Sequence, residues 1–477
     1  MATRVLQVKG ASTDELSAGV AAIQQEQGLS PDFPADVERA AEQAARSPRL
    51  PATDLTHLEL VTIDPVGAMD LDQAMHLAAD GDGYVVHYAI ADLMAFLAPG
   101  DPVDEEAHRR GESLYGADSK IPLHPKVLSE GAASLLPDQE RPAFVWTIRL
   151  DATGETRDAT VQRARVRSRQ RLDYESVQRA MGQAPAGSTL ALLRTVGELR
   201  IAKEAERGGV SLPMPAQEID VRPDGRWLLE FRDMLPVEDW NAQISLLTGF
   251  AAASIMVKGQ VGILRTLPPA PEYAVTKLRR TARALGIDWP SGQSHPDFIR
   301  SLDPSHPAEA AMVVACTALL RGAGYAAFDG HVPEQPEHAA LASTYAHVTA
   351  PLRRLVDRYG LEICTALSAG EPVPQWVLDR LDDLPDTMRE SGRKSHAYEN
   401  AVLNLVEAWT LQSRIGETFA GVVTEVEQDD ERKGTVMVRE PAVEATVTSS
   451  SPLPVGQDVT VTLTDADPVT RKVRFSL

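Results

Sequence analysis

The sequence predicts a mixed helix-and-strand protein in which a large domain is followed by a small β-barrel. The chain of 477 residues is too long for one compact core. Up to about residue 412 it mixes strand-like and helix-like stretches without an internal repeat. From Gly416 it changes to short alternating segments separated by polar and Gly/Pro turns. Five such strands in about 60 residues are typical of an OB-fold barrel.

We therefore expect three segments. Residues 1–49 form a short Ala-rich lead-in, helical around ADVERAAEQAARS, which leaves no space for a further barrel. Residues 50–412 form the large domain, and residues 413–477 form the OB-fold barrel.

The composition is that of an ordinary soluble protein, with 43% hydrophobic and 24% charged residues. No apolar run reaches the roughly 18 residues of a membrane span, and the first residues do not resemble a signal peptide. Cys316 and Cys364 fit no metal-binding spacing. Buried reduced thiols in a cytoplasmic protein are favoured over a disulfide.

The net charge of -21 argues against a protein that coats nucleic acid, because phosphate neutralisation needs clustered Lys and Arg. An acidic protein can still carry a local basic channel. Local clusters of charge are therefore more informative about function than the net charge.

The first cluster is acidic. A strand-like run, LELVTI, ends next to Asp64, and the chain returns with Asp70 and Asp72 before a hairpin whose turn lies at residues 80–83. In extended chain Asp70 and Asp72 point to one face, and the loop can fold Asp64 over them. Two such charges about 4 Å apart repel by roughly 4 kcal/mol at an effective dielectric near 20, which a cation relieves. All-oxygen ligation favours Mg²⁺, with Mn²⁺ as substitute. The alternative is that these residues are turn formers and surface charge.

The second cluster is basic. Thr349 can cap a helix whose first turn contains Pro351, and the apolar positions fall on one face: Leu352, Leu355, Val356, Tyr359 and Ile363. Arg353 and Arg354 then lie near the positive helix N-terminus, where a pair of guanidiniums can hold a phosphate. The alternative is an amphipathic helix with a solvated arginine pair.

A third cluster has a period of two. Five arginines alternate along one predicted strand: Arg163, Arg165, Arg167, Arg169 and Arg171. One interpretation is a positive rail for an RNA backbone, with Arg167 and Arg169 as contacts. The other is an edge strand made soluble by charge, or arginines paired with the abundant acids.

Two motifs carry a resemblance to a known family. TIDPVGAMDLDQA resembles the Asp-x5-Asp-x-Asp-Asp signature of the ribonuclease II (RNB) family, and TYAHVTAPLRR resembles its Tyr-x-His-x-Thr-x-Pro-x-Arg-Arg motif. The resemblance covers roughly residues 30 to 477. It implies an α+β fold, with a large RNB catalytic domain followed by an OB-fold RNA-binding domain of the S1 type.

The resemblance also implies residue roles. Asp64, Asp70 and Asp72 would hold catalytic Mg²⁺, with Asp72 central. Gln73 stands at the fourth position, where its amide oxygen can still ligate metal but adds no negative charge. Arg353 would contact the scissile phosphate.

Further implied roles concern the bound strand. The residues that would line the region around the phosphate are Tyr345, His347, Thr349 and Arg354. Tyr115 would stack on a base near the 3′ end. The family's partner aromatic is missing from GGVSLPMPAQEI, and Ser245 or Leu246 stands where the family often has a ribose-recognising glutamate.

The resemblance therefore implies a processive, Mg²⁺-dependent 3′→5′ exoribonuclease that hydrolyses single-stranded RNA to nucleoside 5′-monophosphates. We expect a cytoplasmic monomer that needs no organic cofactor and no membrane. One rival is a catalytically impaired RNA-binding member, motivated by Gln73 and the missing aromatic. The other is an acidic scaffold whose OB-fold binds protein partners.

Overall fold

The fold was described from a computed structural model, in which residues 6–9, 14–116, 120–212, 216–221, 227–232, 234–427, 429–438 and 440–477 are described. The described helices are α1 (Asp14–Glu26), α2 (Ala35–Arg46), α3 (Pro102–Arg110), α4 (Tyr174–Ala180), α5 (Thr189–Arg207), α6 (Pro236–Gly259), α7 (Glu272–Ala284), α8 (His295–Arg300), α9 (Pro307–Cys316), α10 (Leu355–Ala369), α11 (Gln375–Leu381) and α12 (Leu384–Leu411).

The described strands are β1 (Leu6–Lys9), β2 (Leu60–Asp64), β3 (Gln73–Asp80), β4 (Gly83–Ala91), β5 (Leu114–Tyr115), β6 (Lys120–Ile121), β7 (Glu140–Leu150), β8 (Thr156–Asp173), β9 (Ala216–Val221), β10 (Trp227–Arg232), β11 (Val261–Thr266), β12 (Gly324–Asp329), β13 (Glu337–His338), β14 (Ser343–Thr344), β15 (Thr418–Val426), β16 (Lys433–Val438), β17 (Val443–Thr448), β18 (Asp458–Asp467) and β19 (Lys472–Ser476).

Two closed barrels organise the described part of the chain, which confirms the α+β class with a C-terminal OB-fold. The larger domain contains the barrel β2-β3-β4-β7-β8, and the C-terminal barrel has the order β15-β16-β17-β19-β18. The expected hairpin forms between β3 and β4, with Asp80 paired to Gly83. The arginine-rich segment is a strand, β8, antiparallel to β7 and parallel to β2.

Helices pack around the larger barrel and carry the main core. α6 is apolar and long enough to cross a membrane by length and composition alone, but half of its most apolar window is buried inside the protein. Ile244, Leu247 and Met256 of α6 join barrel residues such as Trp146 in one hydrophobic cluster. These contacts make α6 the central packing helix of the large domain.

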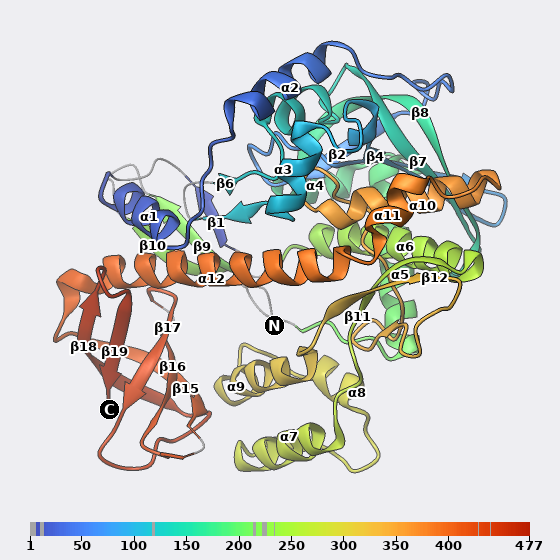
Figure 1. Ribbon diagram of the computed structural model, residues 1–477. Helices are drawn as coiled ribbons and strands as arrows, with labels where there is room; N and C mark the ends of the chain where they lie inside the picture. The colour runs from blue at the N-terminus through green and yellow to red at the C-terminus, as the bar shows by residue number, and fades with distance from the viewer. Residues whose placement is uncertain are drawn as a thin grey trace.

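The helix α12 connects the two parts of the molecule. Figure 1 shows α12 crossing between α1 and the C-terminal barrel. Tyr398 and Val402 of α12 share a hydrophobic cluster with Leu16 of α1 and with Val423 and Phe475 of the barrel. Gln24 donates a hydrogen bond of 2.9 Å to the Tyr398 hydroxyl. The lead-in, whose expected helix forms as α2, is thus packed onto the rest of the chain.

The two cysteines, Cys316 and Cys364, are free and buried, as expected from their apolar surroundings. Cys316 belongs to a separate cluster formed by α7, α8 and α9, with Leu278, Phe298 and Met312. Periodicity along the sequence did not single out this helical unit.

A buried ion pair fixes α10 against α3. Arg358 of α10 donates to Asp104 of α3, and their side chains are only 2% and 5% exposed. Asp104 also accepts from the Gly100 amide at 2.7 Å. Because α10 follows directly after the Arg353 segment, this pair helps to position that segment.

We predict that Asp104→Ala lowers the free energy of unfolding by about 3–5 kcal/mol, because it leaves the Arg358 charge buried without its partner. Urea titration followed by circular dichroism measures the change. The control is Glu390→Ala, which removes an exposed ion pair with Lys394 and should leave the midpoint unchanged. Equal midpoints for the two variants would contradict the prediction.

Candidate active site

The three aspartates flank the loop between two strands of the larger barrel. β2 ends at Asp64, and the chain returns through Asp70 and Asp72 directly before β3. Asp72 is only 4% exposed. The Oδ2 atom of Asp64 is buried and has no hydrogen-bond partner in the described part of the chain. Such an oxygen is a group that a cation or ligand can satisfy.

Asp72 joins the acidic loop to the arginine motif. Its Oδ1 accepts a hydrogen bond of 2.7 Å from the Leu352 backbone amide. Its Oδ2 lies 3.8 Å from Nε of Arg353. The two motifs found separately in the sequence therefore meet at one carboxylate.

Asp70 is held by a lysine that the sequence analysis did not identify. Nζ of Lys120 lies 2.8 Å from Oδ2 of Asp70 and 3.2 Å from Oε1 of Glu130. Burial works to lower the pKa of Lys120, but the Asp70 and Glu130 carboxylates outweigh it and raise this pKa above its ordinary value. The available signal was a lone lysine five residues after Tyr115.

Burial makes the other two carboxylates unfavourable as isolated anions. It raises the pKa of Asp64 to about 7, with a further contribution from the Asp70 charge, while Arg353 and Arg171 act in the opposite direction. Burial also raises the pKa of Asp72 well above its ordinary value. A cation close to these groups would favour their charged forms.

The expected convergence of three carboxylates around one point is not formed in this structure. Among the described residues, no three His, Cys, Asp or Glu side chains lie close enough together to form a metal site as they stand. The physical reason is that protein donors already engage two of the three: Lys120 holds Asp70, and the Leu352 amide holds Asp72.

Gln73 links β3 to the arginine segment. Its Oε1 accepts a hydrogen bond of 2.5 Å from the Tyr88 hydroxyl, and its Nε2 donates to the Thr349 carbonyl at 2.7 Å. These bonds occupy one of the two lone pairs of Oε1. Gln73 therefore acts first as a tether, and metal ligation by its remaining lone pair stays a prediction.

The predicted helix start at Thr349 is wrong. α10 begins at Leu355 with Arg354 as its N-cap residue, and residues 349–354 form a turn that side chains hold. Asp357 accepts from the Ala350 amide and Asp72 from the Leu352 amide. The five residues expected on the apolar face are nevertheless all buried, namely Leu352, Leu355, Val356, Tyr359 and Ile363.

The two arginines differ in their surroundings, which corrects the prediction of an arginine pair. Nε and Nη2 of Arg354 each donate to Asp357 at 2.9 Å, and the Arg354 side chain is 16% exposed. Arg354 is thus a structural cation. Arg353 is 40% exposed and lies beside Asp72, so it is the member of the pair that can reach a phosphate.

Tyr345, His347 and Thr349 line the interior side of this segment. His347 Nδ1 lies 2.7 Å from the Tyr325 hydroxyl, and burial holds the pKa of His347 well below its ordinary value. Its ring meets that of Tyr345 edge to face at 5.4 Å. A neutral imidazole in such contacts positions neighbours rather than carrying charge to a substrate.

α6 approaches this segment closely. A Cβ at Gly249 would lie 2.1 Å from Cε2 of Tyr345, so only glycine fits there. Four residues earlier on α6, Ser245 Oγ lies 3.0 Å from Thr349 Oγ1. Ser245, one of the two residues that stand where the resemblance implies a glutamate, therefore lies at the edge of the site.

Tyr115 lies close enough to Arg353 for the two side chains to interact electrostatically. It is 36% exposed. Burial raises its pKa to about 12, and the charges of Arg353, Asp70 and Lys120 all act on it. The structure thus brings Tyr115 together with the acidic loop. Part of GGVSLPMPAQEI, at residues 213–215, lies outside the described residues.

The arginine series on β8 is paired with protein groups. Arg165 and Arg167 bridge to Glu140, and Arg169 donates to the Thr56 carbonyl at 2.7 Å. Arg163 reaches Asp92 at 2.8 Å, and Arg171 donates to the Ala68 carbonyl. Charge pairing, the second interpretation, therefore describes Arg167 better than a free rail, and Arg169 is held by a backbone carbonyl.

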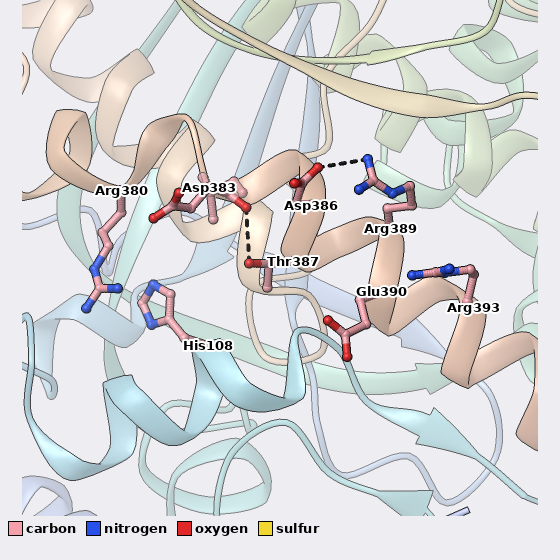
Figure 2. Close-up of a pocket in the computed structure, with 9 residues that line it drawn as sticks. His108, Arg380, Asp383, Asp386, Thr387, Arg389, Glu390 and Arg393 are labelled. Atoms are coloured by element: carbon pink, nitrogen blue, oxygen red, sulfur yellow. Dashed lines mark hydrogen bonds and ion pairs between the residues drawn. The ribbon is translucent and has the colours of Figure 1, made fainter.

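A polar pocket lies apart from these residues (Figure 2). It lies between α3 and the start of α12, and its lining includes His108, Arg380 and Arg389. Arg389 pairs with Asp386 at 2.8 Å, and Arg380 pairs with Glu105 at 2.9 Å. None of the predicted site residues lines this pocket.

Comparison with known families decides the relationship. The RNB domain family matches residues 52–366. The chain belongs to the RNB family. The RNase II-type exonuclease C-terminal S1 domain family matches residues 417–477.

One curated protein is similar to this chain in sequence, and two solved structures are similar to it in fold. Ribonuclease R of Escherichia coli (strain K12) is 29% identical over 402 residues, which cover 78% of this chain and 48% of that protein. The structure of Mycoplasma genitalium RNase R in complex with ribose methylated single-stranded RNA has a TM-score of 0.86 at 19% identity, covering 97% of this chain and 78% of that one. Yeast Ssd1, a pseudonuclease, matches with a TM-score of 0.71 at 14% identity, over 95% and 57% of the two chains. The chain spans about half the length of the curated relatives it matches.

We predict that replacing the two arginines of this RNB site by alanine affects different properties: Arg353→Ala chiefly lowers activity and Arg354→Ala chiefly lowers stability. Arg353→Ala should lower the rate of RNA cleavage by roughly 10²–10³-fold, the effect of losing one preorganised charge-stabilising donor, with a smaller loss of stability than Arg354→Ala. Arg354→Ala should lower the free energy of unfolding by about 3–5 kcal/mol, because Asp357 is left buried and unpaired. Cleavage assays and urea titrations on both variants measure this; equal stability losses would contradict it.

Proposed function

We propose that this chain is a processive, Mg²⁺-dependent 3′→5′ exoribonuclease that hydrolyses single-stranded RNA to nucleoside 5′-monophosphates. The observation that carries the proposal is the buried Asp72 carboxylate held between the Leu352 amide and Arg353. It brings an acidic group suited to a hard cation next to an exposed guanidinium suited to a phosphate.

The residues present fit a divalent ion. Asp64, Asp70 and Asp72 would hold it, since Asp64 has an unpartnered buried oxygen and burial disfavours lone charges on Asp64 and Asp72. When bound, Mg²⁺ or Mn²⁺ supplies Lewis-acid activation of water and neutralises charge at the reacting phosphate.

The protein's own groups bind and orient the RNA. Arg353, whose Nε lies 3.8 Å from the Asp72 carboxylate and whose side chain is partly exposed, would hold the scissile phosphate, and Tyr115 would stack on the terminal base. The Asp72–Leu352 hydrogen bond fixes the backbone next to Arg353, so the phosphate is held at a constant place relative to the acidic loop. After each cleavage the bound strand would advance by one nucleotide and place its new 3′ end in the site, so that one mononucleotide is released at a time.

The relatives support RNA as the substrate. Ribonuclease R is the name of the matching E. coli protein, and the M. genitalium homologue is described with single-stranded RNA. We further propose a cytoplasmic monomer that needs neither an organic cofactor nor a membrane.

The decisive test is Asp72→Asn. The variant keeps the acceptor for the Leu352 amide but loses the charge, so it should fold normally and lose cleavage. The loss should exceed the roughly 10–100-fold that follows removal of groups that only orient a metal ligand. End-labelled single-stranded RNA is incubated with Mg²⁺ or EDTA and resolved on gels. Asp80→Asn, in the exposed hairpin turn, is the matched control.

Other outcomes of the same assay distinguish the rivals. Mononucleotide release by Asp72→Asn would refute the proposed site. RNA binding by the wild-type chain without cleavage in Mg²⁺ would favour a catalytically impaired member, as the engaged Gln73 and the pseudonuclease Ssd1 illustrate. Absence of RNA affinity, with salt-insensitive association to proteins, would favour the acidic scaffold.

We also predict that Tyr115→Ala weakens the grip on the 3′ end by about 1–3 kcal/mol, the value of one base stack. KM should rise and the final oligonucleotide should become longer, while the rate at saturating RNA changes less. Steady-state kinetics on oligonucleotides of graded length measure the effect. Tyr115→Phe should behave like the wild type; a Tyr115→Ala variant with unchanged KM and unchanged end product would disprove the stacking role.

A further inference from the structure

Lys120 is placed where a bound cation would otherwise be expected. Its Nζ lies between the carboxylates of Asp70 and Glu130, at 2.8 and 3.2 Å, and its side chain is 19% exposed. An ion pair this sheltered is screened less by water and salt than a surface pair. Lys120 therefore neutralises Asp70 in the resting protein.

The strand geometry keeps the ammonium in place. Lys120 lies on β6, directly opposite Tyr115 on β5 in an antiparallel pair. Leu114 and Ile121, the other pair of this short ladder, are buried in a hydrophobic cluster. The apolar pair anchors the ladder, so the neighbouring pair presents Tyr115 and Lys120 from a fixed support.

Two departures act in the same direction on the site charge. Gln73 removes one carboxylate from the four-aspartate pattern that the motif resembles, and Lys120 adds a positive charge against another. Four carboxylates meet two cations here, which leaves two uncompensated negative charges that one divalent ion neutralises; the carboxylates are Asp64, Asp70, Asp72 and Glu130, and the cations are Lys120 and Arg353. A second divalent ion would meet an excess of positive charge, because Lys120 already engages the two carboxylates on that side, Asp70 and Glu130.

We propose that Lys120 is a built-in cation that takes the place of a second divalent ion beside Asp70, so that this site binds a single ion, chiefly through Asp64 and Asp72. The inference rests on the proposed function for the identity of the site. Lys120 acts through Asp70 and is a positioning residue. A merely structural ion pair would stabilise the fold without setting the number of bound ions.

The test counts ions directly. Mn²⁺ is titrated into the purified full chain, and free Mn²⁺ is measured by electron paramagnetic resonance. The wild type should bind one tight Mn²⁺ per chain. The double variant Lys120→Met/Gln73→Asp should bind two, because it restores the fourth carboxylate and frees Asp70. Lys126→Met, at an exposed lysine nearby, is the matched control and should bind one.

Thermal unfolding provides a second readout. In EDTA, Lys120→Met should melt at a lower temperature than the wild type, because Asp70 has lost its cation. Added Mn²⁺ should raise the melting temperature of Lys120→Met more than that of the wild type, since ligand binding to the native state stabilises by mass action. Lys120→Arg, which keeps the charge, should respond like the wild type.

The outcomes separate this inference from the proposed function. Two tight ions on the wild type, or no tight ion, would overturn the role of Lys120 whether or not RNA is degraded. An unchanged count in the double variant would overturn it too. One ion on the wild type and two on the double variant support it, and lack of RNA cleavage alongside would count against the exoribonuclease proposal alone.

Discussion

The hydrogen bond from the Leu352 amide to Asp72 closes a loop of 280 residues and creates the site. Together with the hydrogen bond from Gln73 to the Thr349 carbonyl, it joins the acidic loop of the barrel to the arginine segment before α10. It also explains why Asp72 can be almost fully buried: one oxygen has a backbone donor and the other faces Arg353 at 3.8 Å. Burial and partnership together produce a carboxylate that is fixed in position and sensitive to any cation nearby.

Around this contact the protein supplies several of its own positive charges in sheltered places. Arg354 with Asp357, Arg358 with Asp104 and Lys120 with Asp70 each pair an interior or half-buried acid with a base. Although acidic residues outnumber basic ones in this chain, several of the basic side chains therefore stabilise the interior and do not face solvent. Arg353 differs from these residues because its closest carboxylate is at ion-pair range only, which leaves its donors available.

Local sequence patterns predicted some features of the fold and the site and failed to predict others. The hairpin, the terminal barrel and the buried face of α10 follow from strand and helix periodicity, which depends on neighbours in sequence. The start of α10 could not be predicted, because Asp72 and Asp357 capture backbone amides that would otherwise begin the helix. The burial of Arg354 and the approach of Lys120 to Asp70 depend on contacts between distant segments. The spacing of residues in the sequence predicts neither contact, and neither of the two motifs includes Lys120.

The shared packing of α1, α12 and the C-terminal barrel has a consequence for how the molecule can be divided. Since Leu16, Tyr398 and Phe475 belong to one apolar cluster, cutting the chain before the barrel would expose the apolar face of α12 that packs against the barrel. The S1 module is therefore not a tethered appendage that swings freely at the end of a linker. A fragment that ends between the two family matches would therefore expose apolar residues of α12 to water. A transferable unit has to contain α1, α12 and the C-terminal barrel together.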